Sequence, residues 1–81
     1  MAKVDVKCFG VLRIDSKIAK TSLDAEDIAD VFLKMNALIE GDMTVEYGQA
    51  LVYLNGERCT SKRKKLNDGD EVWLLSPASG G

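Results

Sequence analysis

The chain has no histidine and only two cysteines, and each shortage removes a class of function. Without histidine, the usual general base and the commonest metal ligand are missing, so neither a Ser-His-Asp nor a Cys-His arrangement can be built. Cys8 and Cys59 lie far apart, form no Cys-x-x-Cys pair and are too few for a disulfide framework or a four-ligand zinc site. We therefore expect neither an autonomous enzyme nor a metal site, and the cysteine usage favours a reducing, cytoplasmic location.

The sequence also lacks a long hydrophobic run and a strong excess of either charge. Eleven Lys and Arg residues face 13 Asp and Glu residues, and the formal net charge of −2 attracts neither nucleic acid nor anionic membrane. Charged residues interrupt the N-terminal stretch, which predicts neither a signal peptide nor a membrane span. With 81 residues, 46% hydrophobic and 30% charged, the composition is that of one small globular domain.

Hydrophobic periodicity predicts two strands and one helix in the first half of the chain. Apolar and charged residues alternate over residues 4–8, which is typical of a half-buried strand, and residues 18–21 are a candidate second strand. From Asp24 onward, apolar residues recur at helical spacing. Asp24 is the predicted N-cap with Asp27 at the third helical position, and Gly41 is the predicted stop after about four turns.

The second half predicts a hairpin and a final strand. Residues 50–54 form a predicted strand, Asn55-Gly56 is a strong hairpin signal, and residues 57–59 return from it. Residues 71–76 form the last apolar strand. This order of elements resembles the ubiquitin-like β-grasp, an α+β fold in which one main helix packs on one face of a mixed sheet. We expect the first and last strands to lie side by side at the sheet centre.

Strand alternation assigns two faces to this predicted sheet. Phe9, Trp73 and Leu75 fall on the face away from the helix, where large apolar side chains indicate a docking patch for a partner. The alternative is that one or more of them lies in a second small core under the loops. The face toward the helix is expected to consist of Val4, Val6, Cys8, Val72 and Leu74.

A basic run covers Lys62 to Lys65, with Arg58 nearby. Clustered cations give sequence-independent affinity for phosphates, but no aromatic residue is interleaved here and the domain is acidic. We expect a solvated loop and no nucleic-acid binding. A further interpretation is that these cations steer the chain onto acidic partner surfaces, which makes the association rate sensitive to salt.

The C-terminal part carries the most specific resemblance to a family. The runs Leu-Asn-Asp-Gly-Asp-Glu-Val at residues 66–72 and Pro-Ala-Ser-Gly-Gly at residues 77–81 resemble the ubiquitin-like sulfur carriers, closest to the small, sulfur-carrying subunit of molybdopterin synthase. Phe9 and Arg13 add to this resemblance, which covers nearly the whole chain in element order. It implies a β-grasp domain over residues 1–76 and a flexible tail over residues 77–81.

The resemblance implies a chemical role for the end of this tail. Glycines lack Cβ, so Gly80 and Gly81 can thread a narrow groove, together with Pro77 and Ser79, and present a terminal carboxylate inside a partner's active site. A ubiquitin-activating-type adenylyltransferase would use ATP to adenylate Gly81, and a persulfide sulfur donor would then yield a thiocarboxylate. The large molybdopterin-synthase subunit would take this sulfur for the molybdenum cofactor. The chain itself is expected to bind no cofactor.

The tail departs from the family pattern and leaves the pathway open. The family commonly has two prolines and a β-branched residue before the last small residue and the diglycine, whereas residues 76–79 here are Ser-Pro-Ala-Ser. A carrier for thiamine thiazole or another sulfur pathway remains an alternative, as does a ubiquitin-like modifier that forms isopeptide bonds. A β-grasp module that binds protein or RNA needs no free terminal glycine, and a disordered glycine-rich end is the alternative for the tail itself.

Overall fold

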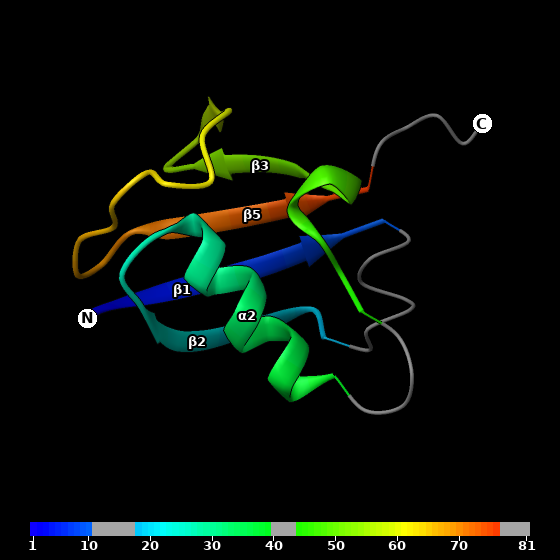
Figure 1. The fold of residues 1–81 in the computed structure, drawn as a ribbon, viewed down its shortest axis with the longest axis horizontal. Helices are drawn as coiled ribbons and strands as arrows, with labels where there is room; N and C mark the ends of the chain where they lie inside the picture. Colours follow the sequence, from blue (N-terminus) through cyan, green and yellow to red (C-terminus); the bar gives the residue numbers. More distant parts are fainter. Residues whose placement is uncertain (11–17, 40–43, 77–81) are drawn as a thin grey trace.

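The computed structural model describes residues 1–10, 18–39 and 44–76, which build a five-stranded sheet with helix α2 packed across one face (Figure 1). Within these residues no helix has the length and apolar character that a membrane span requires. The elements in chain order are β1 (Ala2–Phe9), β2 (Lys20–Ala25), α2 (Ile28–Leu38), the 3-10 turn η1 (Tyr47–Gln49), β3 (Leu51–Leu54), β4 (Glu57–Cys59) and β5 (Glu71–Leu75).

The first and last strands lie side by side at the centre of the sheet, as predicted. The strand order is β2-β1-β5-β3-β4. β1 and β5 run parallel, with Asp5 opposite Glu71 and Phe9 opposite Leu75, whereas the other neighbours are antiparallel. The mixed sheet and its covering helix confirm the predicted ubiquitin-like β-grasp.

The hydrophobic core lies between α2 and the sheet face that the alternation predicted. β1 and β5 both alternate between buried and more exposed residues, and all five predicted core positions of these strands are buried. Burial of each such side chain contributes roughly 1.5–3 kcal/mol to the free energy of unfolding. From the helix, the residues that pack against them are Ile28, Val31, Phe32 and Met35.

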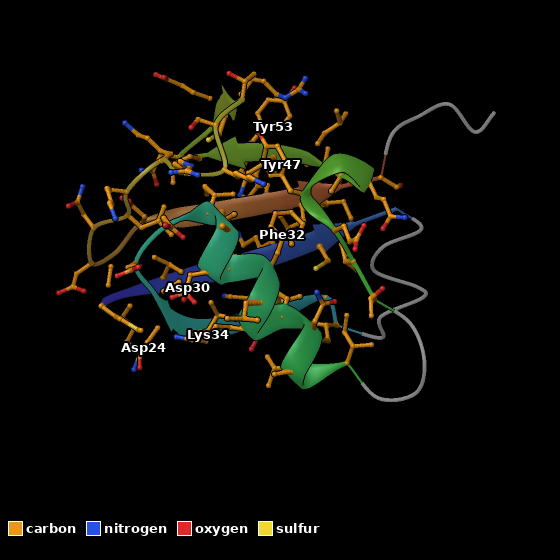
Figure 2. All side chains as sticks on the ribbon, viewed as in Figure 1. Asp24, Asp30, Phe32, Lys34, Tyr47 and Tyr53 are labelled. Carbon is orange, nitrogen blue, oxygen red and sulfur yellow. The ribbon has the colours of Figure 1, made fainter. Side chains whose placement is uncertain are left out.

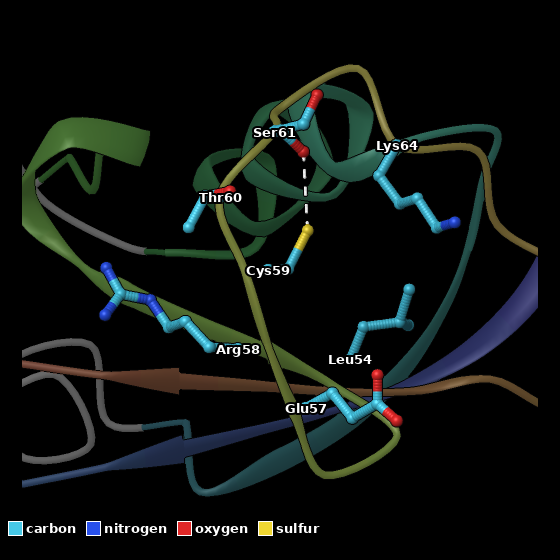
Figure 3. Close-up of a pocket in the computed structure, with 7 residues that line it drawn as sticks. All are labelled: Leu54, Glu57, Arg58, Cys59, Thr60, Ser61 and Lys64. Carbon is cyan, nitrogen blue, oxygen red and sulfur yellow. Dashed lines mark hydrogen bonds between the residues drawn. The ribbon is translucent and has the colours of Figure 1, made fainter.

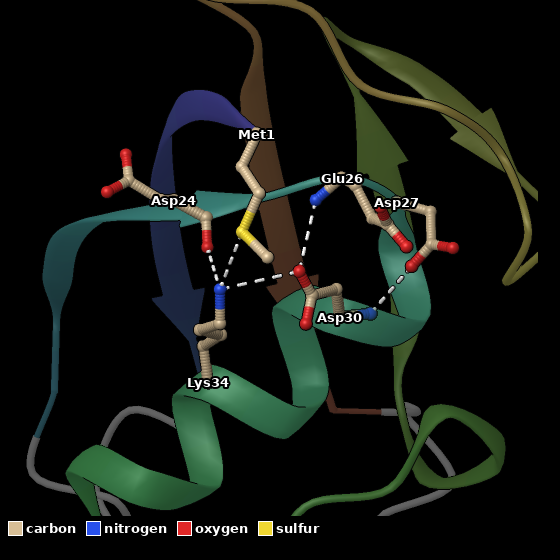
Figure 4. Close-up of polar contacts among 6 residues, drawn as sticks. All are labelled: Met1, Asp24, Glu26, Asp27, Asp30 and Lys34. Carbon is tan, nitrogen blue, oxygen red and sulfur yellow. Dashed lines mark hydrogen bonds and ion pairs between the residues drawn. The ribbon is translucent and has the colours of Figure 1, made fainter.

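The helix begins later and is shorter than the periodicity predicted. Asp24 is not its N-cap: Asp24 belongs to β2 and pairs with Lys3. Asp27 caps the helix instead, and its Oδ1 accepts a hydrogen bond from the Asp30 backbone N–H at 2.8 Å (Figure 4). Both aspartates are acceptable caps locally, and only the pairing of β2 with β1 decides between them. The helix ends at Leu38 after 11 residues, about three turns, and Gly41 lies outside the described residues.

The second strand also begins and ends later in the sequence than predicted. It was predicted over residues 18–21, but β2 covers Lys20–Ala25 because Leu23 and Ala25 face Val4 and Ala2 across the pair. β3 begins one residue later and β5 ends one residue earlier than predicted, whereas β4 has the predicted bounds.

The predicted hairpin at Asn55-Gly56 is confirmed in its backbone. Asn55 has φ 52° and Gly56 has φ 88°, and a type I′ turn requires positive φ at both central residues. Asn55 also ties the turn to the start of β5, since its Oδ1 accepts a hydrogen bond from the Glu71 backbone N–H at 2.9 Å. The hairpin therefore fixes the end of the sheet at which β5 begins.

Candidate docking face and C-terminal arm

The three predicted patch residues share the sheet face that points away from α2. Phe9 lies opposite Leu75 across the β1–β5 pair, and the rings of Phe9 and Trp73 meet edge to face with centroids 5.8 Å apart. Phe9 is 39% exposed, while Trp73 and Leu75 are half-buried. The structure therefore brings the three together on a partly exposed surface, and their role in binding a partner stays a prediction.

Sequence reasoning missed two further members of this group, Tyr53 and Leu51 of β3. Tyr53 lies directly opposite Trp73, with ring centroids 6.4 Å apart, and Leu51 lies opposite Leu75. Strand alternation over residues 50–54 was a signal that Tyr53 and Leu51 share one face, but the pairing of β3 with β5 was not predicted. We call this group the aromatic face: Phe9, Leu51, Tyr53, Trp73 and Leu75.

Helix α2 and the 3-10 turn η1 both lie on the side of the sheet opposite the three patch residues. The ring of Phe32 from α2 meets the ring of Tyr47 from η1 edge to face, with centroids 5.9 Å apart, and Figure 2 places both on the helix side of the sheet. Neither α2 nor η1 covers Trp73. These two elements therefore form no second core over Trp73, and the docking role of the patch stays a prediction.

A carboxylate holds the tryptophan in place. The indole Nε1–H of Trp73 donates a hydrogen bond to Oε1 of Glu71, and Lys7 Nζ lies 3.3 Å from the same oxygen. The indole hydrogen bond, assisted by Lys7, lowers the pKa of the Glu71 carboxyl below its ordinary value, while burial and the charge of Asp5 oppose the shift. Glu71 is therefore ionised at neutral pH and orients the indole ring.

Ser76, which follows β5, lies beside Gly10, which follows β1. Gly10 follows β1 with φ +65°, and a Cβ at this position would lie 2.7 Å from Oγ of Ser76. The left-handed conformation favours glycine here, and a larger residue would also displace the Ser76 side chain. β5 thus carries Trp73 and Leu75 on the aromatic face and leads directly through Ser76 into the predicted tail. The remaining predicted site residues lie outside the described part of the chain: Arg13, Pro77, Ser79, Gly80 and Gly81.

A shallow hollow of about 280 Å³ lies beside β4 and contains Cys59 (Figure 3). The Cys59 thiol donates to the Ser61 carbonyl oxygen at 3.4 Å, whereas Cys8 is buried in the core, as expected. Among the described residues, no three His, Cys, Asp or Glu side chains gather in a way that holds a metal ion. Glu57, Arg58 and Lys64 also line the hollow, but among the described residues the thiol makes its hydrogen bond to the Ser61 backbone and to none of these three side chains.

The mixed five-stranded sheet with one covering helix defines a class, the proteins with the ubiquitin-like β-grasp fold. Small archaeal modifier protein 1 from Methanosarcina acetivorans is 26% identical, with 100% of this chain and 98% of that chain covered and a TM-score of 0.81. The corresponding protein from Haloferax volcanii is 22% identical over 99% of this chain and 100% of that chain, with a TM-score of 0.79.

A second kind of neighbour comes from molybdopterin biosynthesis. The complex of subunits 1 and 2 of the molybdopterin-converting factor from Helicobacter pylori contains a chain with 26% identity, 98% and 99% coverage and a TM-score of 0.65. No family model and no curated protein matches the sequence. The structural similarities agree with the predicted resemblance: the chain has a ubiquitin-like β-grasp fold and is similar to a small modifier protein and to a chain of a molybdopterin-converting factor complex.

Proposed function

We propose that the chain is a sulfur carrier whose reactive group is the carboxylate of Gly81. The observation that carries this proposal is the course of β5, which leads from the aromatic face straight into a segment ending in Gly80-Gly81. A partner that covers Trp73 and Leu75 thereby contacts the strand that precedes the arm in the sequence. The similarity to small modifier proteins and to a molybdopterin-converting factor subunit supports the same role.

The proposed chemistry takes place in partner proteins. A carboxylate is a poor electrophile, so its oxygen first attacks the α-phosphorus of ATP in an adenylyltransferase of the ubiquitin-activating type, which releases pyrophosphate and forms an acyl-adenylate. A persulfide sulfur then attacks the acyl carbon and displaces AMP. A thiol reduces the resulting acyl disulfide, leaving a thiocarboxylate on Gly81 and a disulfide on the donor side.

The favoured destination of the sulfur is molybdopterin. The Helicobacter pylori neighbour was solved as a complex of subunits 1 and 2 of the molybdopterin-converting factor. By this similarity, the aromatic face would bind a large synthase subunit while the arm enters that subunit's active site. Apolar side chains at the centre of such an interface supply most of its affinity.

The second candidate is a protein modifier. Two of the similar structures are named small archaeal modifier proteins, which favours an isopeptide bond to lysines of other proteins as the fate of the activated carboxylate. Both functions use the same adenylate, and they differ only in the nucleophile that displaces AMP.

The deciding experiment is the intact mass of the protein purified from its host. A carrier shows a fraction in which sulfur replaces one oxygen at Gly81, and the same mass establishes which residue ends the mature protein. A modifier instead leaves the segment of residues 66–81 on lysines of other proteins after tryptic digestion, because Lys65 is the last basic residue before Gly81. A protein with neither signal is not a carrier or a modifier.

A matched pair of variants ties the chemistry to the arm. Deletion of Gly81, or an added residue after it, should abolish sulfur transfer while the circular dichroism of the fold stays unchanged. Gly48→Ala should leave transfer intact, because Gly48 lies in the folded domain and has open space around its Cβ position. Reconstitution with a large molybdopterin-synthase subunit and the pterin precursor then tests the pathway.

A further inference from the structure

The connection between β4 and β5 concentrates the positive charge of the molecule. Five of the 11 Lys and Arg residues lie between positions 58 and 65, a stretch without any acidic residue. All five are exposed, and within the described part of the chain none is paired with a carboxylate. We call them the basic cluster: Arg58, Lys62, Arg63, Lys64 and Lys65.

The backbone beneath this cluster is held in place by the helix. The first-turn N–H groups of α2 donate to the connection, from Ile28 to the Lys64 carbonyl at 3.2 Å and from Ala29 to the Lys62 carbonyl at 2.8 Å. Leu66, immediately after the cluster, is buried in the core. The cations are thus displayed on a fixed backbone, which lowers the ordering cost of binding.

An apolar hollow adjoins the cluster on the flank of the helix. It has a volume of about 460 Å³ and is lined in part by Phe32, Leu33, Tyr47 and Lys62, with the exposed carboxylate of Glu46 beside Tyr47 in the sequence. Leu33 is 68% exposed, the largest exposure of any described large apolar residue after Met1. A second hollow of about 360 Å³ shares Lys62 and is otherwise lined mainly by cations and the helix start. An apolar contact and a positive field therefore lie side by side.

We propose that the basic cluster and the hollow beside Leu33 bind an acidic segment of a partner protein that carries an apolar side chain. The apolar side chain would lie against Leu33 and the carboxylates against Lys62 and its neighbours. A nucleic acid fits less well. The cluster is short and bordered by Asp27 and Glu57, and an extended phosphate backbone would continue onto acidic surface. No aromatic side chain belongs to the cluster to stack on bases.

The basic cluster lies near the end of the sheet where β5 begins, whereas the hollow extends to Tyr47 of η1, shortly before β3 begins opposite the end of β5. The start of α2, the end of β2 and the start of β5 lie at one end of the sheet, and the chain leaves β5 toward residue 77 at the other end (Figure 1). The basic cluster and the hollow beside Leu33 lie on the helix side of the sheet, so one partner can bind them while another covers the aromatic face on the opposite side (Figure 2).

The probe is a fluorescently labelled peptide rich in glutamate with one central leucine, titrated with the full chain and followed by anisotropy. We expect saturable binding that weakens as ionic strength rises, because salt screens exposed charges. Lys62→Glu and, separately, Leu33→Ser should each weaken binding by about tenfold. The matched controls, Lys20→Glu on β2 and Leu38→Ser at the helix end, should stay within about twofold of the parent protein.

Three results overturn the proposal. The first is an absence of binding, or equal binding of a peptide with glutamine in place of glutamate. The second is tighter binding of labelled polyuridine than of the acidic peptide. The third is equal loss in the control variants. Circular dichroism of each variant separates loss of the surface from loss of the fold, and sulfur loading of the parent protein is measured independently.

Discussion

At the scale of single residues, Glu71 connects a charged residue of β1, Lys7, with Trp73 of the aromatic face. Its carboxylate accepts from the Trp73 indole and lies near Lys7, so the interaction is strongest while Glu71 is ionised. When folding lowers the pKa of a carboxyl group, its ionised form stabilises the folded protein at pH values above the unfolded-state pKa. This stabilisation is lost as the pH falls through the folded-state pKa. The orientation of the indole should follow the same titration.

The expected result is an acid-side change in the fluorescence of Trp73, which is the chain's only tryptophan. Its midpoint should lie below the ordinary pKa of glutamate, because the indole hydrogen bond favours the ionised form. Glu71→Gln should remove this transition, whereas Glu57→Gln, on exposed β4, should leave it in place. A midpoint above the ordinary glutamate value contradicts the geometry.

Gly10 is the second residue with a specific role, because β1 and the chain after β5 meet at it. Gly10→Ala should lower the free energy of unfolding by about 2 kcal/mol, since it forces a left-handed residue and a contact with Ser76. Urea denaturation measures the loss. Gly48→Ala has open space and serves as the control, and equal stability of the two variants would show that Ser76 moves freely away.

At the scale of elements, local signals located the strands and the hairpin, but tertiary pairing set two of the boundaries. Asp24 and Asp27 are equivalent caps in sequence, and the extension of β2 to Ala25 removes Asp24 from the choice. Similarly, alternation placed Phe9, Trp73 and Leu75 on one face, but Tyr53 joins them only through the β3–β5 register. Single-sequence patterns carry no information on such registers, so the candidate site was predicted in part.

The helix start can be tested directly. Asp27→Ala removes the side chain that accepts the Asp30 N–H and should destabilise the protein by about 1 kcal/mol. Asp24→Ala should change stability by less than about 0.5 kcal/mol, because Lys34 contacts only the Asp24 backbone carbonyl there. Thermal or urea denaturation compares the two, and a larger loss at Asp24 would place the cap where the periodicity predicted it.

At the scale of the whole molecule, two surfaces lie apart. The aromatic face spreads over β1, β5 and β3 on the open side of the sheet, and the basic cluster lies on the connection that docks against the start of α2. The first is apolar and the second is charged, so their complexes should differ in salt dependence.

Phe9→Ser should weaken the complex with a large molybdopterin-synthase subunit by about tenfold, because an exposed aromatic contact at the interface centre is lost. Folding should persist, since Phe9 is 39% exposed. Calorimetric titration measures the affinity, with Leu38→Ser on the helix as the control. Unchanged affinity for Phe9→Ser would remove the aromatic face from the interface.

The parallel pairing of β1 with β5 also has a consequence for biosynthesis. Val6 pairs with Val72, which lies near the other end of the sequence. The two central strands therefore cannot pair until β5 has left the ribosome. Contacts of such high sequence separation slow folding, because the intervening loop must be closed first. A nascent chain interrupted before residue 71 therefore has no completed aromatic face and no arm. A chain interrupted there would not compete with the finished protein for a partner of the aromatic face.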